Sequence, residues 1–143
     1  MLNRTITVEH GGVSYGGEVM KIKSTSLGIE DHGIFSFHLH CEAKGSGVGV
    51  GGIGMDEPHH DDDGKFVGRR GTAFGMDLIA EVLKTAGVGS WEKLPGTSIV
   101  VLYAGSSRTY LGSMSVGFAS LLGDEVLIFS EFAKAHLPAE VTA

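Results

Sequence analysis

The sequence of 143 residues contains very little cysteine or proline and no long hydrophobic run. Its single cysteine, Cys41, excludes an intrachain disulfide and fits a reducing compartment. The first residues lack the apolar core of a signal peptide, and no apolar stretch approaches the roughly 20 residues that a membrane helix needs. We therefore expect a single domain over residues 1–143, located in the cytoplasm and without contact to a membrane.

Positive charge is also scarce in this sequence. The formal net charge is −6 with neutral histidines, whereas a protein that binds polymeric nucleic acid needs an extended basic face. This balance argues against DNA or RNA as a partner. A small anionic ligand remains compatible with it, because one or two arginines are enough to hold a phosphate.

Glycine, by contrast, is abundant. The 23 glycines amount to more than twice the usual share of about 7%. With only three prolines, they indicate tight turns, bulges and close backbone approaches rather than a disordered linker. In residues 45–54 the glycines alternate with Val48 and Val50, and Ile53 follows. This pattern predicts a strand with one bare side, which lets a ligand or another backbone come close.

The first half of the chain shows strand patterns. Apolar and charged residues alternate in residues 19–23, and the clearest strand covers residues 34–42. In that strand Cys41 shares one face with apolar side chains, while His38 and His40 share the opposite face. The residues between these two strands, 27–33, are typical of a hairpin turn.

The second half begins with the one long helix. Apolar residues at helical spacing predict it over residues 71–86, and Gly87 is a natural left-handed stop. Strands are expected at residues 98–103 and 109–116, and Ser130 is expected to cap a last short helix. This order predicts an α+β fold, in which a mostly antiparallel twisted sheet carries the main helix on one face and a short helix follows at the C-terminus.

The start of the main helix is the most conspicuous candidate for a binding site. Arg69 and Arg70 end a polar loop, expected at residues 56–68, and Gly71 and Thr72 lead from them into the first helical turn. The unpaired amides of such a turn attract anions, phosphates above all. Two interpretations remain open: the guanidinium groups and amides capture a phosphate, or the arginines balance the aspartates of a solvated loop.

Aromatic and polar side chains near this point extend the candidate ligand site. Phe74 and Tyr110 are able to stack a base, although core packing also explains Phe74. Arg108 supplies a further positive charge close to Tyr110 in the sequence. Met76 and Asp77 lie off the main apolar stripe of the helix, where they either line a pocket edge or meet solvent.

Two groups of residues are candidates for catalysis. Glu30, Asp31 and His32 combine two carboxylates with a histidine, yet a turn gives no reason for either carboxylate to lose its solvent. His38 and His40 form the second group. An enzyme that acts on a nucleotide would use one of them.

We expect no metal site and no cofactor. The strand histidines and the polar segment 59–63, with two histidines and three aspartates, lie on separate elements. Zinc would need three or four converging ligands with partners behind them.

Four segments carry a resemblance to small proteins of phages and prophages. They are residues 24–34 (STSLGIEDHGI), the glycine-rich residues 45–54, residues 70–76 (RGTAFGM) and residues 90–96 (SWEKLPG). On these motifs, which span residues 20–97, the chain resembles the first type of Thoeris anti-defence protein.

The resemblance implies a sponge rather than an enzyme. Members of that family bind cyclic ADP-ribose isomers made by bacterial TIR-domain proteins and hold them without cleaving them. Some also bind cyclic oligonucleotides at separate sites, and they form dimers or hexamers. A sponge in the cytoplasm of an infected host, assembled as a homodimer or hexamer, is therefore one expectation. The alternatives are the nucleotide-processing enzyme and a phage structural or regulatory protein without a small ligand.

The resemblance also assigns roles to residues. It implies that Phe74 is a platform against the adenine or ribose and that the neighbouring arginines hold phosphates. Family members have further arginines after the helix. In this chain residues 99–107 contain none before Arg108, which implies an altered ligand preference or a lost site.

Overall fold

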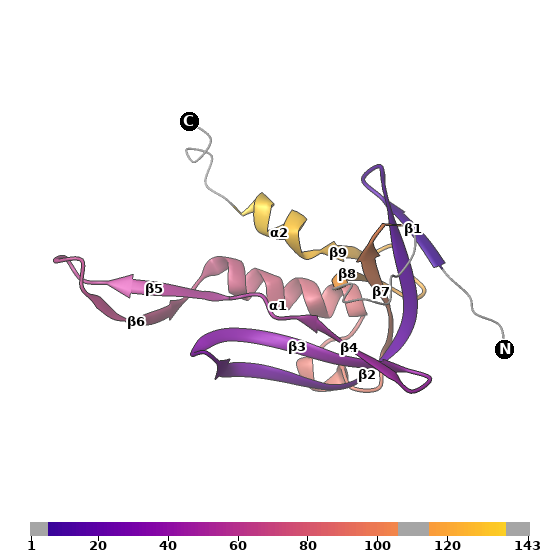
Figure 1. Ribbon diagram of the computed structural model, residues 1–143, viewed down its shortest axis with the longest axis horizontal. Helices are drawn as coiled ribbons and strands as arrows, with labels where there is room; N and C mark the ends of the chain where they lie inside the picture. The colour runs from indigo at the N-terminus through magenta and orange to yellow at the C-terminus, as the bar shows by residue number, and fades with distance from the viewer. Residues whose placement is uncertain (1–5, 106–114, 137–143) are drawn as a thin grey trace.

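The computed structural model describes residues 6–105 and 115–136, which form the predicted α+β fold. The strands are β1 (Ile6–His10), β2 (Val13–Asp31), β3 (Ile34–Ala43), β4 (Ser46–Gly51), β5 (Asp56–His60), β6 (Phe66–Gly71), β7 (Ser98–Ala104), β8 (Ser115–Ser120) and β9 (Val126–Ile128). The helices are α1 (Ala73–Ala86), the 3₁₀ helix η1 (Trp91–Lys93) and α2 (Phe129–Ala135) (Figure 1).

The main sheet is antiparallel, with the order β4-β3-β2-β7-β8-β9 and β1 attached to β2. Strand β2 is 19 residues long and pairs with β1, β3 and β7. The turn from β2 to β3 is only His32–Gly33, because β2 continues to Asp31. Both turn residues have positive φ angles (56° and 75°). A two-residue turn with this backbone matches the twist of the flanking strands.

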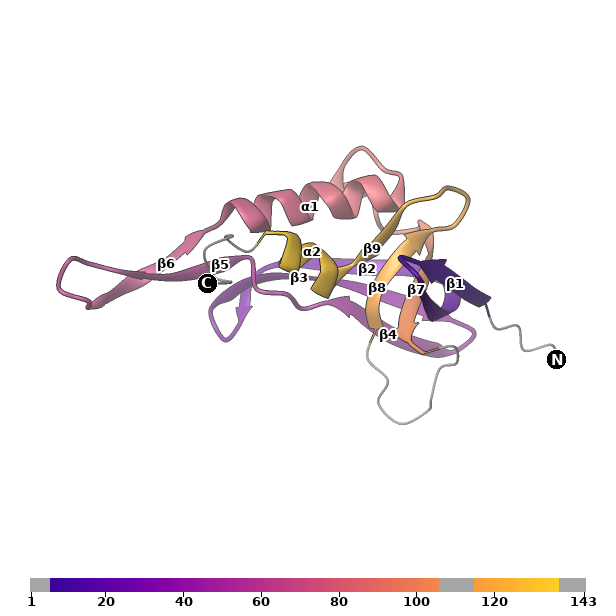
Figure 2. The same ribbon diagram turned by 90° about the horizontal axis from the view of Figure 1, so that it is seen from above.

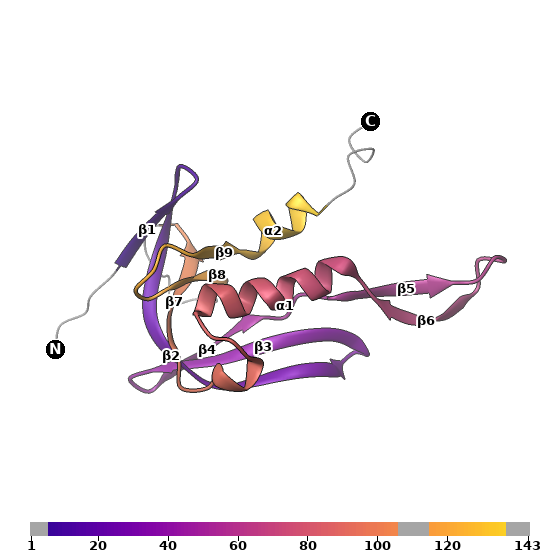
Figure 3. The same cartoon turned by 180° about the vertical axis from the view of Figure 1, so that it is seen from behind.

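The core lies between the sheet and α1, which Figure 3 shows running between the β2–β3 hairpin and the β9–α2 segment. Leu78 and Val82 of α1 are buried, as the helical spacing predicted. Gly75 lets the helix approach closely, because a Cβ atom at this position would collide with the carbonyl oxygen of Met55. The predicted face of β3 is confirmed as well, since its alternate apolar residues, Phe37, Leu39 and Cys41, are all buried.

The start of α1 differs from the boundary predicted from the sequence, whereas its end agrees with the prediction. α1 begins at Ala73 rather than at residue 71, because Thr72 is extended and its hydroxyl caps the helix by accepting from the Gly75 amide at 3.0 Å. It ends as predicted at Gly87, which is left-handed with φ 79°.

The expected cap of the last helix is wrong. α2 begins at Phe129, with Ile128 in the cap position, so Ser130 lies inside the first turn. Strand β9 leads directly into this helix, and burial of the Phe129 ring anchors the start. Most of the expected strand at residues 109–116 lies outside the described residues. Strand β8 shares only residues 115–116 with that prediction, continues to Ser120, and pairs antiparallel with β7.

The predicted loop at residues 56–68 is wrong, because this segment belongs to a two-stranded sheet formed by β5 and β6. The hairpin, residues 56–71 and hereafter the arm, projects from the rest of the molecule (Figures 1 and 2). Asp61 organises its tip, since its carboxylate accepts hydrogen bonds from the amides of Asp63 and Lys65 at 3.0 and 2.9 Å. The arm has no apolar alternation, so its strands were missed.

Candidate functional site

Arg69 is occupied by a structural ion pair at the base of the arm. Its Nε and Nη2 atoms donate to the two carboxylate oxygens of Asp56 at 3.0 and 2.9 Å. The Asp56 side chain is only 7% exposed. The hydrogen bond from Arg69 holds the pKa of Asp56 below its ordinary value, and Asp56 in turn raises the pKa of Arg69. This guanidinium group therefore stabilises the arm.

Arg70 is more available. Its Nε atom donates to Glu57 at 3.2 Å, its side chain is 60% exposed, and its terminal nitrogens have no hydrogen-bond acceptor among the described residues. Arg69 and Arg70 are consecutive residues of β6, so their side chains leave opposite faces of the arm. The two groups therefore do not grip one anion together, and Arg70 is the arginine left for a ligand.

The start of α1 adds open backbone donors next to Arg70 in the sequence. The Thr72 hydroxyl donates to the Met55 carbonyl at 2.9 Å and also caps the Gly75 amide, while Gly71 is exposed. Within residues 6–105 and 115–136, the amides of Ala73 and Phe74 have no acceptor. Such amides favour an anion at this end of the helix.

Phe74 lies in an aromatic cluster with residues of α2. Its ring centroid is 5.9 Å from that of Phe132 and 5.5 Å from that of His136. One turn along α1, the Asp77 carboxylate contacts His136 at 3.2 Å. Met76 lies outside the cluster and is 73% exposed. The structure thus brings Phe74 and Asp77 together and leaves Met76 apart.

Sequence reasoning missed the other two residues of this cluster, Phe132 in α2 and His136 directly after it. Phe132 and His136 are four positions apart, which places them on one face of the short helix. That spacing was a usable signal, but nothing in the sequence showed that this face meets Phe74. The other two predicted ligand residues, Arg108 and Tyr110, lie outside the described residues.

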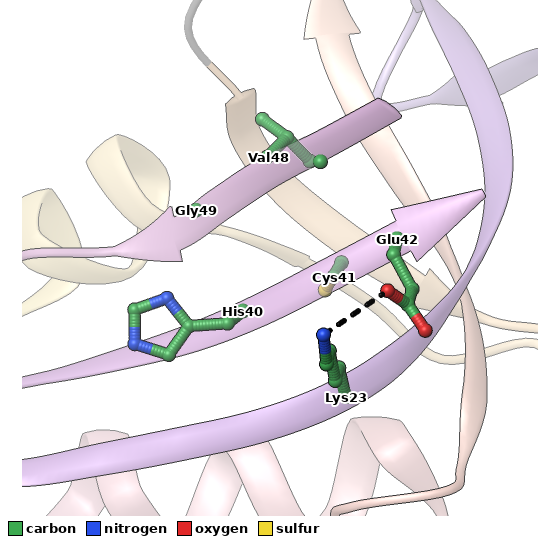
Figure 4. Close-up of a pocket in the computed structure, with 7 residues that line it drawn as sticks. Lys23, His40, Cys41, Glu42, Val48 and Gly49 are labelled. Atoms are coloured by element: carbon green, nitrogen blue, oxygen red, sulfur yellow. Dashed lines mark ion pairs between the residues drawn. The ribbon is translucent and has the colours of Figure 1, made fainter. Parts of the chain in front are cut away.

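Two shallow cavities lie on the outer face of the β2–β3–β4 sheet, away from the predicted site. The larger, of about 370 Å³, is lined in part by Lys23, His40 and Glu42 (Figure 4). The smaller, of about 330 Å³, is lined in part by Ser36 and His38. Neither includes any of the predicted ligand residues. The β3 side chains on this face are polar, and the β4 positions beside them are glycines.

The glycine-rich strand explains the flatness of this outer face. His40 pairs with Gly49 of β4 and His38 pairs with Gly51, so no side chain stands beside either imidazole on that strand. The two rings are stacked with centroids 6.1 Å apart. The prediction of a strand with one bare side is therefore confirmed.

Of the candidate catalytic residues, Glu30, Asp31 and His32 are exposed, whereas His38 is half-buried on β3. His32 Nδ1 lies 2.7 Å from the Asp31 carboxylate at the tip of the β2–β3 hairpin, where the side chains are 89% and 54% exposed. Because water surrounds this pair, neither group is desolvated in the way that is typical of a general acid or base. Catalysis here remains a hypothesis. In the described part of the chain, no three His, Cys, Asp or Glu side chains group around a common point that would suit a metal ion.

Cys41 is buried, and burial raises the pKa of its thiol to about 11. This burial agrees with the predicted apolar face of β3, and a thiol whose thiolate is disfavoured in this way is unreactive.

Within residues 6–105 and 115–136, no helix is both long enough and apolar enough to cross a membrane. No protein-family model, curated protein or solved structure matches this chain.

Proposed function

We propose that this protein binds a small anionic nucleotide of the cyclic ADP-ribose type and sequesters it without cleaving it, in the cytoplasm of an infected bacterial host. A cyclic oligonucleotide is a second ligand of the same class. The proposal combines the sequence resemblance with the residues at the junction of the arm and α1.

The observation that carries this proposal is the position of Arg70. Its terminal nitrogens are uncommitted among the described residues, and β6 runs from it through Gly71 into a helix start with two open amides. A guanidinium fork and free amides are the donors that recognise a phosphate. The nearby Glu57 carboxylate, which is half-exposed, favours a ligand that also presents hydrogen-bond donors, such as ribose hydroxyls, over a bare phosphate.

Phe74 supplies the aromatic part of the proposed site. Its ring is half-buried against Phe132 and His136. A nucleobase would therefore contact the free edge of the ring or replace α2 on it. Holding a ligand in this way requires affinity alone, so no nucleophile or general base is needed. We further propose that a second copy of the chain completes the pocket.

Thermal shift against cyclic ADP-ribose isomers and cyclic oligonucleotides tests binding, because a ligand that binds only the folded state raises the melting temperature. We expect Arg70→Gln to weaken binding by about 1.5–3 kcal/mol, the usual loss of a charged hydrogen bond. Lys65→Gln is the matched control, since it removes an exposed arm cation away from the helix. Equal affinity of both variants would exclude Arg70 from the site.

A release experiment separates sequestration from catalysis. The nucleotide is incubated with the protein, the protein is denatured by heat, and the supernatant is analysed by mass spectrometry. Intact nucleotide supports the proposal. A new product would overturn it and direct attention to Asp31 and His32, whereas no binding by any nucleotide of the panel would leave a structural or regulatory role.

A further inference from the structure

We propose that the arm of one copy of this chain docks on the outer face of the sheet of a second copy, with its aspartates against that copy's lysines. This inference concerns assembly and does not depend on the identity of a ligand.

The arm is the first part of the argument. It is a two-stranded hairpin that extends beyond the body of the molecule (Figures 1 and 2). Such a hairpin is marginally stable in water unless it packs on something. Phe66 and Val67 are nevertheless 56% and 52% exposed on it, and the five residues of the tip, 61–65, are exposed and contain three aspartates and one lysine. The arm therefore carries apolar surface and negative charge that this copy leaves uncovered.

The receiving surface is the outer face of β2, β3 and β4. It is flat because its β4 positions are glycines, and a Cβ atom built on Gly49 would meet nothing within 4 Å. Lys21 and Lys23 project from this part of β2, and Lys44 follows in the β3–β4 turn; all three are exposed. Lys23 is only loosely held by Glu42, at 3.8 Å between side chains that are 69% and 51% exposed.

The two surfaces match in chemistry. Val19, which is 41% exposed, precedes the lysines on β2 with the same alternation and provides an apolar contact for the arm. The lysines oppose the aspartates of the tip, and the bare glycine strand lets a second backbone approach. Exposed ion pairs add little affinity, but they select orientation and suppress wrong pairings.

The positions of the two surfaces select a second copy as the occupant. Along the longest axis of the molecule, the arm tip forms one end and the β3–β4 turn lies toward the other (Figure 1). Two copies side by side in opposite directions would place each arm beside the lysines of its neighbour. The contact then occurs twice around a two-fold axis, which closes the assembly as a dimer. Copies in the same direction would instead set the acidic tips together.

Charge reversal on each surface tests the proposal with the full chain. Asp62→Lys/Asp63→Lys reverses the tip and leaves Asp61, which organises the turn. Lys21→Glu/Lys23→Glu reverses the receiving surface. Analytical ultracentrifugation of each variant alone should show dimerisation weakened at least about tenfold, because like charges then face each other. An equimolar mixture should recover the dimer.

The matched control is Lys84→Glu/Lys93→Glu, which makes the same change of charge on α1 and η1. It should leave dimerisation unchanged, and circular dichroism verifies that every variant is folded. Increasing salt should weaken the wild-type dimer through screening. Gly49→Phe places a large side chain on the outer face of β4 without changing the charge, and it should also weaken the dimer.

A second measurement keeps the proposal falsifiable if a reversed variant fails to fold. Asp63→Cys and Lys23→Cys chains, mixed under mild oxidation, should form a disulfide-linked heterodimer faster than either forms a homodimer. A protein that stays monomeric at about 100 μM would overturn the proposal, as would a dimer that survives both reversals or reversed variants that do not recombine. Association of the lysine surface with a different protein, without self-association, would also overturn it.

Discussion

His136 joins the two helices by hydrogen bonds from both of its ring nitrogens. Nδ1 lies 2.9 Å from the carbonyl oxygen of Phe132, and Nε2 lies 3.2 Å from the carboxylate of Asp77. Both partners are acceptors only, so both nitrogens must carry a hydrogen for the two bonds to exist together. The geometry therefore belongs to the protonated imidazolium, and these contacts raise the pKa of His136 above its ordinary value of 6.5.

The first prediction is a pH-dependent contact between α2 and α1. A raised pKa in the folded state means that the stabilisation is complete below the ordinary value and is lost as pH rises through the raised one. We expect the melting-temperature difference between wild type and His136→Gln to be largest near about pH 5.5 and to vanish by about pH 9. Asp77→Asn should lower the pKa of His136 in an NMR titration. An unshifted titration in wild type would contradict the assignment.

The second prediction concerns the close approach of α1 to Met55. Gly75→Ala places a methyl group against a backbone carbonyl, which cannot move as a side chain does. We expect a loss of about 1–3 kcal/mol in the free energy of unfolding, measured with urea, despite the better helix propensity of alanine. Gly89→Ala is the control, since nothing lies within 4 Å of its new methyl group. Equal stability of both variants would refute the contact.

The third prediction separates the two arm arginines. Arg69→Gln leaves the Asp56 carboxylate, 7% exposed, without its guanidinium partner, whereas Arg70→Gln leaves the half-exposed Glu57 in contact with water. Hydrogen exchange of the arm amides should therefore accelerate much more for Arg69→Gln. Because the pKa of Asp56 is lowered in the folded arm, the wild-type arm should itself loosen as pH falls through that lowered value. Equal exchange in the two variants would contradict the structural role of Arg69.

The fourth prediction concerns the reactivity of Cys41. Burial raises the pKa of its thiol from an ordinary 9.0 to about 11, so at pH 8 the thiolate fraction should be about 100-fold lower than for a free cysteine. Reaction with a disulfide reagent should accordingly be slow in buffer and fast in urea. Rapid labelling of the native protein would mean that β3 opens readily or that the thiol is exposed.

Local patterns in the sequence were enough to place β3, α1 and the bare strand β4. In each case one face is apolar and the other is polar or absent, so the period of the pattern reports the element. The arm was not predicted because cross-strand ion pairs and a turn organised by Asp61 stabilise it. Neither feature produces a periodic pattern in the sequence. The contacts of Phe74 were not predicted for a related reason, since Phe132 and His136 reach its ring only through tertiary packing.

The candidate site was accordingly predicted in part. The position of Arg70 next to an open helix start follows from local sequence and is present. That Arg69 points to the opposite face depends on β6 being a strand, which the sequence did not indicate. The outer-face cavities were suggested only by the bareness of β4, because their walls come from β2 and β3 as well.

The sharing of β2 among three neighbours orders the folding of the chain during synthesis. Its pairings with β1 and β3 join residues close in sequence through two-residue turns, so this part of the sheet can form early. Its pairing with β7, in which Gly16 lies opposite Tyr103, cannot begin until residues 98–104 have left the ribosome. Until then one edge of β2 is unpaired and is able to pair with another chain. A nascent chain stalled before residue 98 should therefore be the species most dependent on a chaperone.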